Sequence, residues 1–216
     1  ANSFLEIRNR IARVREMRLS SSAESTRSYA KHSHKFRQIQ GISKTSCIVI
    51  PRVTSENREY LPVGYFDKTT IVGDRNFVIC DAPIWNIGLI ASRLHWVWIG
   101  AVCVRMRTDF SYSNTLGWNT FPVPDLTEKN IADLTKCAED ILLARESHFP
   151  ATIADLYDPE SMPKNLRDAH ERNDEVLERI YIGRRFRNDT ERLEKLFDLY
   201  TEMVAPKAGS KSKAKL

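Results

Sequence analysis

The sequence lacks the short motifs with which most enzymes bind a cofactor or activate a nucleophile. Only eight of its 216 residues are glycine, and no two of them form a GxG arrangement. It contains no P-loop, no GxSxG and no HExxH, and no Asp…ExK arrangement of the kind that holds magnesium in nucleases. We therefore assign no catalytic residue, no metal site and no cofactor to this chain alone.

Cysteine is scarce and is not clustered. The four cysteines are far apart, with no CxxC pair and no histidine at a spacing suited to zinc: Cys47, Cys80, Cys103 and Cys137. This usage predicts four buried or half-buried thiols in the reducing cytoplasm.

Long apolar runs are also rare. The longest, residues 84–104, is interrupted by Asn86, Arg93 and His95. A charge near the centre of a membrane span costs a few kcal/mol, so the run predicts a buried helix and no membrane partner.

Charge is distributed unevenly along the chain, although the formal net charge is only +5. Residues 1–45 carry a net +7, residues 46–120 carry +1, residues 121–205 carry −7, and the last eleven residues add four lysines. Such asymmetry predicts a polyanionic partner for the N-terminal half, while ordinary solvated helix faces are the alternative.

The pattern of apolar residues predicts an α+β fold. Residues 3–21 and 24–36 read as basic helices, the first with an apolar stripe. Short runs rich in Val, Ile, Tyr and Phe then predict strands of a small antiparallel or mixed sheet: SCIVIPRV, EYLPVGYF, TTIVGD and RNFVICDAP. A helix of about twenty residues should follow Pro83, and a polar, aromatic loop or short-strand segment should occupy residues 104–125.

The remainder predicts a helical, acidic region. Helices are expected from Thr127 to about His148, from Pro163 to about Ile182, and after a cap at Asn188 or Asp189. We therefore expect a recognition domain at residues 1–122, an all-helical C-terminal domain at 123–205 and a disordered basic tail at 206–216.

Several segments, in one order, resemble the target-recognition region of the MmeI-like restriction–modification enzymes, which are adenine-specific DNA methyltransferases. The matching segments are IPRVTSENREYLPVGYF, GDRNFVICDAPIW, ASRLHWVWIGAVCVRMRTDFSYS, WNTFPVPD and ADLYDPESMPKNLRDAHERNDEVLERIY. The resemblance covers about residues 1–204. One departure is Val104, where the family usually has glycine.

The resemblance implies a function that this chain would share with a larger parent. The parent would bind S-adenosylmethionine and methylate adenine, with Mg²⁺ if it also cleaves, and its catalytic part would lie in the same polypeptide. This chain has neither a glycine-rich loop for that cofactor nor a polar–Pro–Pro–aromatic segment to hold a flipped base. Its own partner would be double-stranded DNA.

Arg107 and Asp109 are the residues that the resemblance implies as a base-reading pair. An arginine can donate to guanine and a carboxylate can accept from cytosine, and two residues at i, i+2 of an extended segment point the same way. An ordinary surface salt bridge is the alternative. Arg75 and Ser111 resemble two further specificity positions, although Arg75 could also be a turn arginine after Asp74.

Other residues are candidates for phosphate contact. Arg52 could bind phosphate or pair with Glu56 or Glu59, and Tyr112, Ser113 and Asn114 could bind phosphate or support the loop. Four basic residues before the sheet suit nonspecific phosphate contact: Lys31, Lys35, Arg37 and Lys44.

The role of one tryptophan and two alternative functions of the chain also remain open. Of the four tryptophans only Trp118 remains a candidate for base stacking, since core packing is the commoner use. The alternatives to a DNA-reading module are an enzyme with an unfamiliar site and a protein-interaction scaffold built on the acidic helices.

Overall fold

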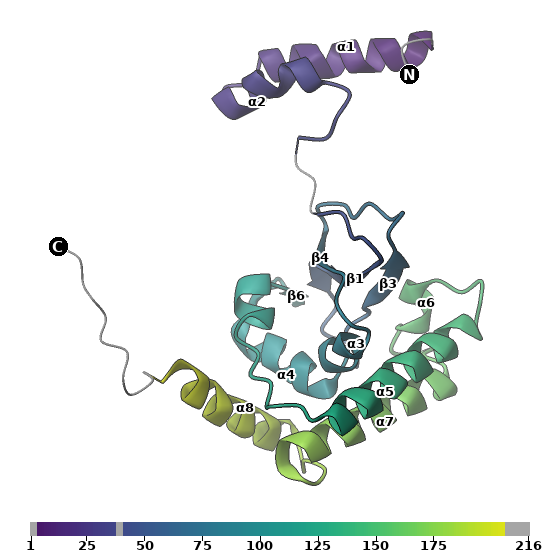
Figure 1. The fold of residues 1–216 in the computed structure, drawn as a ribbon, viewed down its shortest axis with the longest axis vertical. Coiled ribbons are helices and arrows are strands. Elements are labelled where there is room, and N and C mark those ends of the chain that lie inside the picture. Colours follow the sequence, from purple (N-terminus) through teal and green to yellow (C-terminus); the bar gives the residue numbers. More distant parts are fainter. Residues whose placement is uncertain (1–3, 38–40, 206–216) are drawn as a thin grey trace, which may run out of the picture. The chain divides into compact units, whose positions relative to one another are not determined.

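A computed structural model describes residues 4–37 and 41–205, which form two compact units divided after Ile42 (Figure 1). The predicted disordered tail at 206–216 lies outside the described residues. Each unit is described by itself below.

The N-terminal unit consists of short helices held together by one arginine. Helix α1 (Leu5–Leu19) is followed by α2 (Glu24–Ser28) and a 3-10 turn, η1 (Tyr29–His32). The buried guanidinium of Arg18 donates to the backbone oxygens of His32 at 2.9 Å and Lys35 at 2.8 Å, which fixes η1 against α1. Much of the predicted apolar stripe remains exposed, including Leu5 and Met17.

The second unit begins with an antiparallel three-stranded sheet, here called sheet A, of order β3-β1-β4. Its strands are β1 (Ser46–Pro51), β3 (Gly64–Asp67) and β4 (Asn76–Cys80). The strand predicted at TTIVGD is wrong, because none of residues 69–74 belongs to a strand and Ile71 is 71% exposed. There the carboxylate of Asp67 accepts from the backbone N–H of Thr69 at 2.8 Å and forms a turn.

A second antiparallel three-stranded sheet, sheet B, has the order β2-β6-β5. Its strands are β2 (Val53–Thr54), β5 (Val104–Met106) and β6 (Asp109–Ser111). The expected small antiparallel sheet is thus two small sheets, linked at Arg52, which lies between β1 and β2. A π-helical turn, η2 (Asn114–Trp118), follows β6.

The single helix predicted after Pro83 is two helices, α3 (Trp85–Ile90) and α4 (Arg93–Val102). Ser92 breaks the helix because its backbone is extended, with ψ 159°, and its Oγ accepts from the N–H of His95 at 3.1 Å as an N-cap. Apolar periodicity continues through the break, so the sequence pattern conceals it. Both helices are buried in the core, as predicted.

The C-terminal region is helical, as predicted: α5 (Glu128–Glu146), α6 (Ile153–Leu156), α7 (Lys164–Ile182) and α8 (Asp189–Val204). Thr127 and Asn130 form a capping box that begins α5, and Asn188 caps α8. Helix α5 packs between α3 and α7, and α8 packs on α4 (Figure 1). The buried Arg145 donates to the carbonyl of Val63 at 2.6 Å and so ties α5 to the segment before β3.

The cysteines are free thiols: three are buried and Cys80 is half-buried, as predicted. Among the described helices, none has both the length and the apolar character needed to cross a membrane.

Candidate functional site

The outer face of sheet B carries an unusual mixture of side chains. The register pairs Val53 and Val104 with Ser111, and Met106 with Asp109, so all five side chains point to the same face. On the opposite face Phe110 is buried and packs edge-to-face on Trp96 at a centroid distance of 5.0 Å, while Arg105 of β5 stays exposed and pairs with Glu56. The outer face is therefore accessible and is held on a packed scaffold.

A hollow of about 490 Å³ lies beside this face. It is lined by residues from three separate segments of the sequence: Arg52, Val53, Arg75, Met106, Ser111 and Tyr112. Backbone hydrogen bonds fix the three segments, from Arg52 N–H to the oxygen of Arg75 at 3.1 Å and from Tyr112 N–H to the oxygen of Arg52 at 2.8 Å. The fold thus brings together Arg52, Arg75 and Ser111, which the sequence predicted as site residues without placing them side by side.

Arg52 is oriented by local contacts rather than by a carboxylate. Its Nη1 donates to the backbone oxygen of Asp74 at 2.9 Å, and its guanidinium lies 4.8 Å from the centroid of the Phe77 ring. The alternative of an ion pair with Glu56 or Glu59 is wrong, because those carboxylates pair with Arg105 and Arg167. The positive charge of Arg52 therefore has no counter-ion in the part of the chain that the structure describes.

Arg107 lies in the two-residue turn that joins β5 to β6, with a left-handed φ of 61°. The expectation that Arg107 and Asp109 share an extended segment is therefore wrong: Asp109 is the first residue of β6 and Arg107 precedes it by a sharp turn. Asp109 instead shares its face with Ser111. Within residues 4–37 and 41–205 no ion pair joins Arg107 to Asp109, which leaves the salt-bridge alternative without support.

The residues after β6 support the loop. Tyr112 is buried, its Oη lies 3.1 Å from Nε2 of His95, and burial raises the pKa of its hydroxyl. Ser113 caps η2 by accepting from the N–H of Leu116 at 3.2 Å. Trp118 is half-buried and packs against two clusters of core residues, one that includes Ile99 and one that includes Phe121, so it is not a free stacking platform. Of the alternatives for Tyr112, loop support is the one that its contacts favour.

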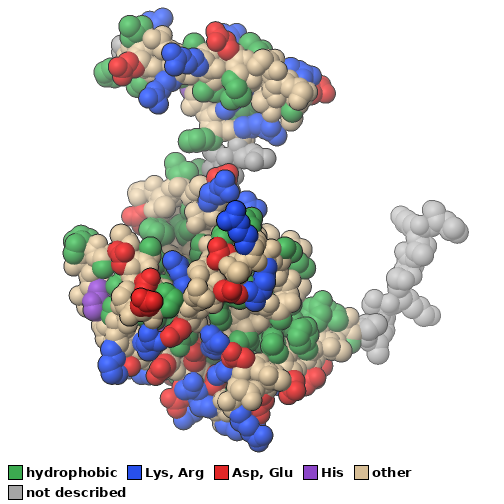
Figure 2. All heavy atoms as spheres, turned by 180° about the vertical axis from the view of Figure 1, so that it is seen from behind, with side chains coloured by type: hydrophobic (Ala, Val, Ile, Leu, Met, Phe, Trp, Pro, Cys, Tyr) green, Lys and Arg blue, Asp and Glu red, His purple; other side chains and the backbone are tan. Residues whose placement is uncertain are grey.

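The basic residues before the sheet are exposed, and they belong to both units. Lys31, Lys35 and Arg37 are in the N-terminal unit, where Lys and Arg side chains lie among apolar ones on the visible surface (Figure 2). Arg37 donates to Oγ1 of Thr26 at 2.8 Å. Lys44 is in the second unit, where the carboxylate of Asp81 accepts from its backbone N–H at 2.9 Å and its side chain stays exposed.

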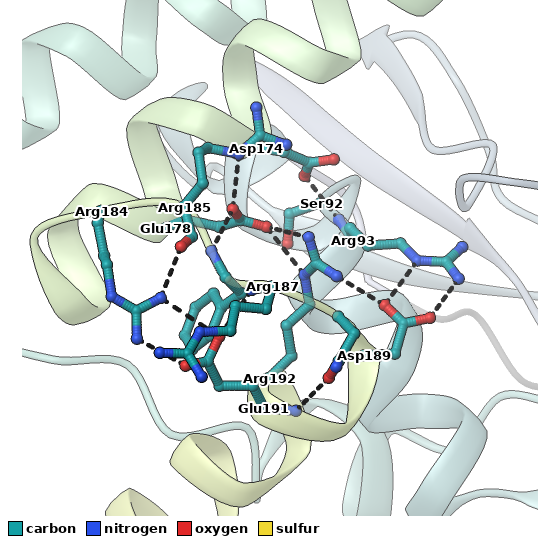
Figure 3. A network of polar contacts seen from close by, with 12 residues as sticks. Ser92, Arg93, Asp174, Glu178, Arg184, Arg185, Arg187, Asp189, Glu191 and Arg192 are labelled. Atoms are coloured by element: carbon teal, nitrogen blue, oxygen red, sulfur yellow. Dashed lines mark hydrogen bonds and ion pairs between the residues drawn. The ribbon is translucent and has the colours of Figure 1, made fainter.

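A network of ion pairs occupies the junction of α4, α7 and α8 (Figure 3). The fully buried carboxylate of Glu178 accepts from Arg185 at 2.7 Å and from Arg192 at 2.5 Å. Asp189 bridges Arg192, at 2.8 Å, and Arg93, at 2.6 Å. The network therefore clamps α7 and α8 to α4, the helix that leads into sheet B.

Two carboxylates at this junction have strongly shifted pKa values in opposite directions. Burial, followed by the neighbouring Glu178, raises the pKa of Asp174 to about 7, although the N–H of Arg93 donates to it at 2.7 Å. The hydrogen bond from Arg184 lowers the pKa of the half-buried Glu191 to about 2. The side chains of Arg184 and Arg185 are paired with the carboxylates of Glu191 and Glu178.

In the described residues no group of three or more His, Cys, Asp or Glu side chains could hold a metal ion.

The residues that sequence reasoning missed are the apolar ones on the outer face of sheet B. The alternation of β5 and β6 placed them there, but the short strands gave too little pattern to predict the register.

Comparison with known proteins assigns both parts of the chain. Residues 1–125 match the family described as MmeI, target recognition domain, and residues 126–206 match MmeI, C-terminal domain. The chain is 40% identical over 198 residues to DNA methyltransferase A of Bacillus subtilis (strain 168), covering 92% of this chain and 22% of that protein. It superposes with a TM-score of 0.87, at 33% identity, on the type IIL restriction-modification enzyme MmeI solved in complex with DNA, covering 93% of this chain and 27% of that one. The chain thus spans about a quarter of the length of these relatives.

Proposed function

Because the chain belongs to the MmeI family, comprising its target recognition domain and its C-terminal domain, we propose that it reads a specific sequence in double-stranded DNA. The reading surface is the outer face of sheet B together with the adjoining hollow. The protein that contains this chain uses it to present a target adenine to a methyltransferase site in the same polypeptide.

The observation that carries the proposal is the convergence of Arg52, Arg75 and Ser111 on one hollow. Arginine donors match the O6 and N7 acceptors of guanine, and serine can donate to or accept from several base edges. Asp109, on the same sheet face, can accept from N4 of cytosine. These side chains lie on strands and tight turns, which hold them at a fixed spacing as base reading requires.

The remaining chemistry comes from outside this chain. The parent would bind S-adenosylmethionine and transfer its methyl group to adenine in the bacterial cytoplasm, and Mg²⁺ would serve a nuclease part if one is present. Within this chain Lys31, Lys35, Arg37 and Lys44 contact phosphates, which adds affinity without specificity. Purified chain should neither methylate nor cut DNA.

Selection of bound duplexes from a random library, followed by gel-shift titration against salt, tests this function. The chain should enrich one motif, and its affinity for that motif should fall with salt at a slope of about 0.9 per phosphate contact. Arg75→Ala should relax the motif at one base pair. Arg179→Ala, which removes an exposed arginine of α7 that lies away from the hollow, is the matched control and should leave the motif unchanged.

Enrichment of no motif by the unaltered chain would contradict the proposal and would favour a scaffold built on the acidic helices. Binding of labelled S-adenosylmethionine by the chain alone would favour a complete enzyme. A motif that Arg75→Ala and Arg179→Ala leave equally intact would remove Arg75 from the reading surface.

A further inference from the structure

The outer face of sheet B exposes more apolar surface than a strand facing water needs. Val104 is 68% exposed, Met106 is 56% exposed and Val53 is 42% exposed. On the opposite face of the sheet Thr54 of β2 and Phe110 of β6 are buried, whereas Arg105 of β5 is exposed, so β2 and β6 supply the interior packing of this sheet. Exposed apolar side chains that gather on one face mark a surface that another molecule covers.

Two of these side chains line the hollow and the third does not. Val53 lies directly across from Ser111, and Met106 lies directly across from Asp109. Val53 and Met106 border the hollow together with Arg52 and Arg75, whereas Val104 shares the sheet face but is not part of the lining. We call Val53 and Met106 the apolar wall of the hollow.

The charges around the apolar wall restrict what can occupy the hollow. Arg52 and Arg75 supply two cations, Arg107 adds a third at the β5–β6 turn, and Asp109, directly across from Met106, offsets one of them, which leaves a net positive charge. This charge favours a polyanion and disfavours a basic or purely apolar partner. The occupant must nevertheless present an apolar group of its own, because a phosphate or a polar base edge would leave Met106 and Val53 in contact with desolvated polar atoms.

Only one apolar group projects into the major groove of duplex DNA, the C5-methyl of thymine. We propose that Val53 and Met106 contact this methyl group, so that the chain reads a thymine beside the base pair that the arginines of the hollow address. This inference rests on the proposed DNA-reading function and adds two specificity-determining residues to it. Ser111, directly across from Val53 and diagonal to Met106 on the sheet, can bond the polar edge of the same base pair.

The test replaces thymine by deoxyuridine, which differs only in lacking the methyl group. Each thymine of the duplex selected by the full chain is replaced in turn, and the Kd is measured by fluorescence anisotropy. One position should show about fourfold weaker binding with deoxyuridine, the value of one buried methyl group. Val53→Ala/Met106→Ala should bind both duplexes equally at that position.

Val104→Ala is the matched control, because it removes an exposed valine from the same sheet face outside the hollow. It should keep the fourfold difference. Met106→Gln is a second probe that keeps the side-chain length and replaces the apolar end by a polar one, and it should reduce the difference as well. Because all three positions are on the surface, each variant should keep the stability of the unaltered chain, and urea denaturation checks this.

Three results would overturn the inference while leaving DNA reading intact: a selected motif without thymine, equal binding of thymine and deoxyuridine at every position, or a difference that survives Val53→Ala/Met106→Ala. Failure of the chain to select any DNA would instead overturn the proposed function, and this inference with it.

Discussion

Replacing Glu178 by alanine should destabilise the unit formed by residues 43–205 more than any exposed charge substitution. Its carboxylate is fully buried and accepts four hydrogen bonds: from Nε of Arg185 at 2.7 Å, from the N–H of Phe186 at 3.1 Å, and from Nε and Nη2 of Arg192 at 2.8 and 2.5 Å. Removal of one partner leaves the others desolvated and unpaired, which is where the cost arises.

The magnitude depends on which partners can return to water. Arg185 is 46% exposed and can be rehydrated, so its loss should cost little. Arg192 is only 12% exposed, and it retains a single bond to Asp189 at 2.8 Å. Stranding a charge in this way costs about 3–5 kcal/mol, and we expect Glu178→Ala to fall in that range. Glu178→Gln fills the same space but supplies no negative charge, so it should lower the free energy of unfolding by nearly as much as Glu178→Ala.

Urea denaturation followed by tryptophan fluorescence measures this effect, because the indole of Trp98 is buried beside α8. The matched control is Glu175→Ala on the same helix, which removes an exposed pair with Arg179 and should cost below about 1 kcal/mol. Equal losses for Glu178→Ala and Glu175→Ala would refute the claim that the buried network clamps α7 and α8 to α4.

Three further predictions concern binding and pH. Replacing Lys31, Lys35, Arg37 and Lys44 together by alanine should weaken binding to every DNA sequence and reduce the dependence of affinity on salt. An unchanged salt dependence in a gel-shift titration would mean that these side chains do not contact phosphates. Although Arg107 and Asp109 do not share an extended segment, both lie at the turn end of sheet B, and we propose that they address one base pair from there. Changing either alone should weaken binding, whereas Arg107→Glu/Asp109→Arg should invert one base pair of the selected motif; an unchanged motif would exclude the pair from reading. Burial raises the pKa of Asp174 from its ordinary 3.8 to about 7, so its contribution to stability is fully present below about pH 4 and is lost as the pH rises through 7. Asp174→Asn should remove that part of the pH dependence in urea titrations between pH 4 and 8, and parallel curves for the two proteins would show that Asp174 does not titrate in this range.

Local signals predicted the helical C-terminal region well. The Thr127–Asn130 capping box, the position of Pro163 before α7 and the cap at Asn188 are all interactions within one turn of backbone, so a sequence window contains every partner. The break at Ser92 was missed because a serine between two apolar segments is compatible with a continuous helix. Its cap is visible only once the extended backbone is known.

The candidate site was predicted in its residues but not in its arrangement. Arg52, Arg75 and Ser111 meet because sheets A and B adjoin at Arg52, a tertiary relation that no local pattern encodes. The expectation for Arg107 failed for a different reason: RMRTDFS reads as one alternating strand, and only cross-strand pairing shows that residues 107–108 are a turn. For Tyr112 the sequence left phosphate contact and loop support open, because an aromatic hydroxyl can serve the surface or the core equally well.

The left-handed backbone at Arg107 restricts how this protein can change what it recognises. Glycine, asparagine and aspartate adopt that conformation readily, whereas a β-branched side chain there adds strain of about 1–2 kcal/mol. Some substitutions at this position therefore leave the stability of the fold unchanged, whereas others require a second, compensating substitution nearby. Neighbouring positions on β6 have extended backbone, which any side chain can adopt, so this constraint does not apply to them. New specificities should consequently arise more readily at Asp109 and Ser111 than at the turn beside them.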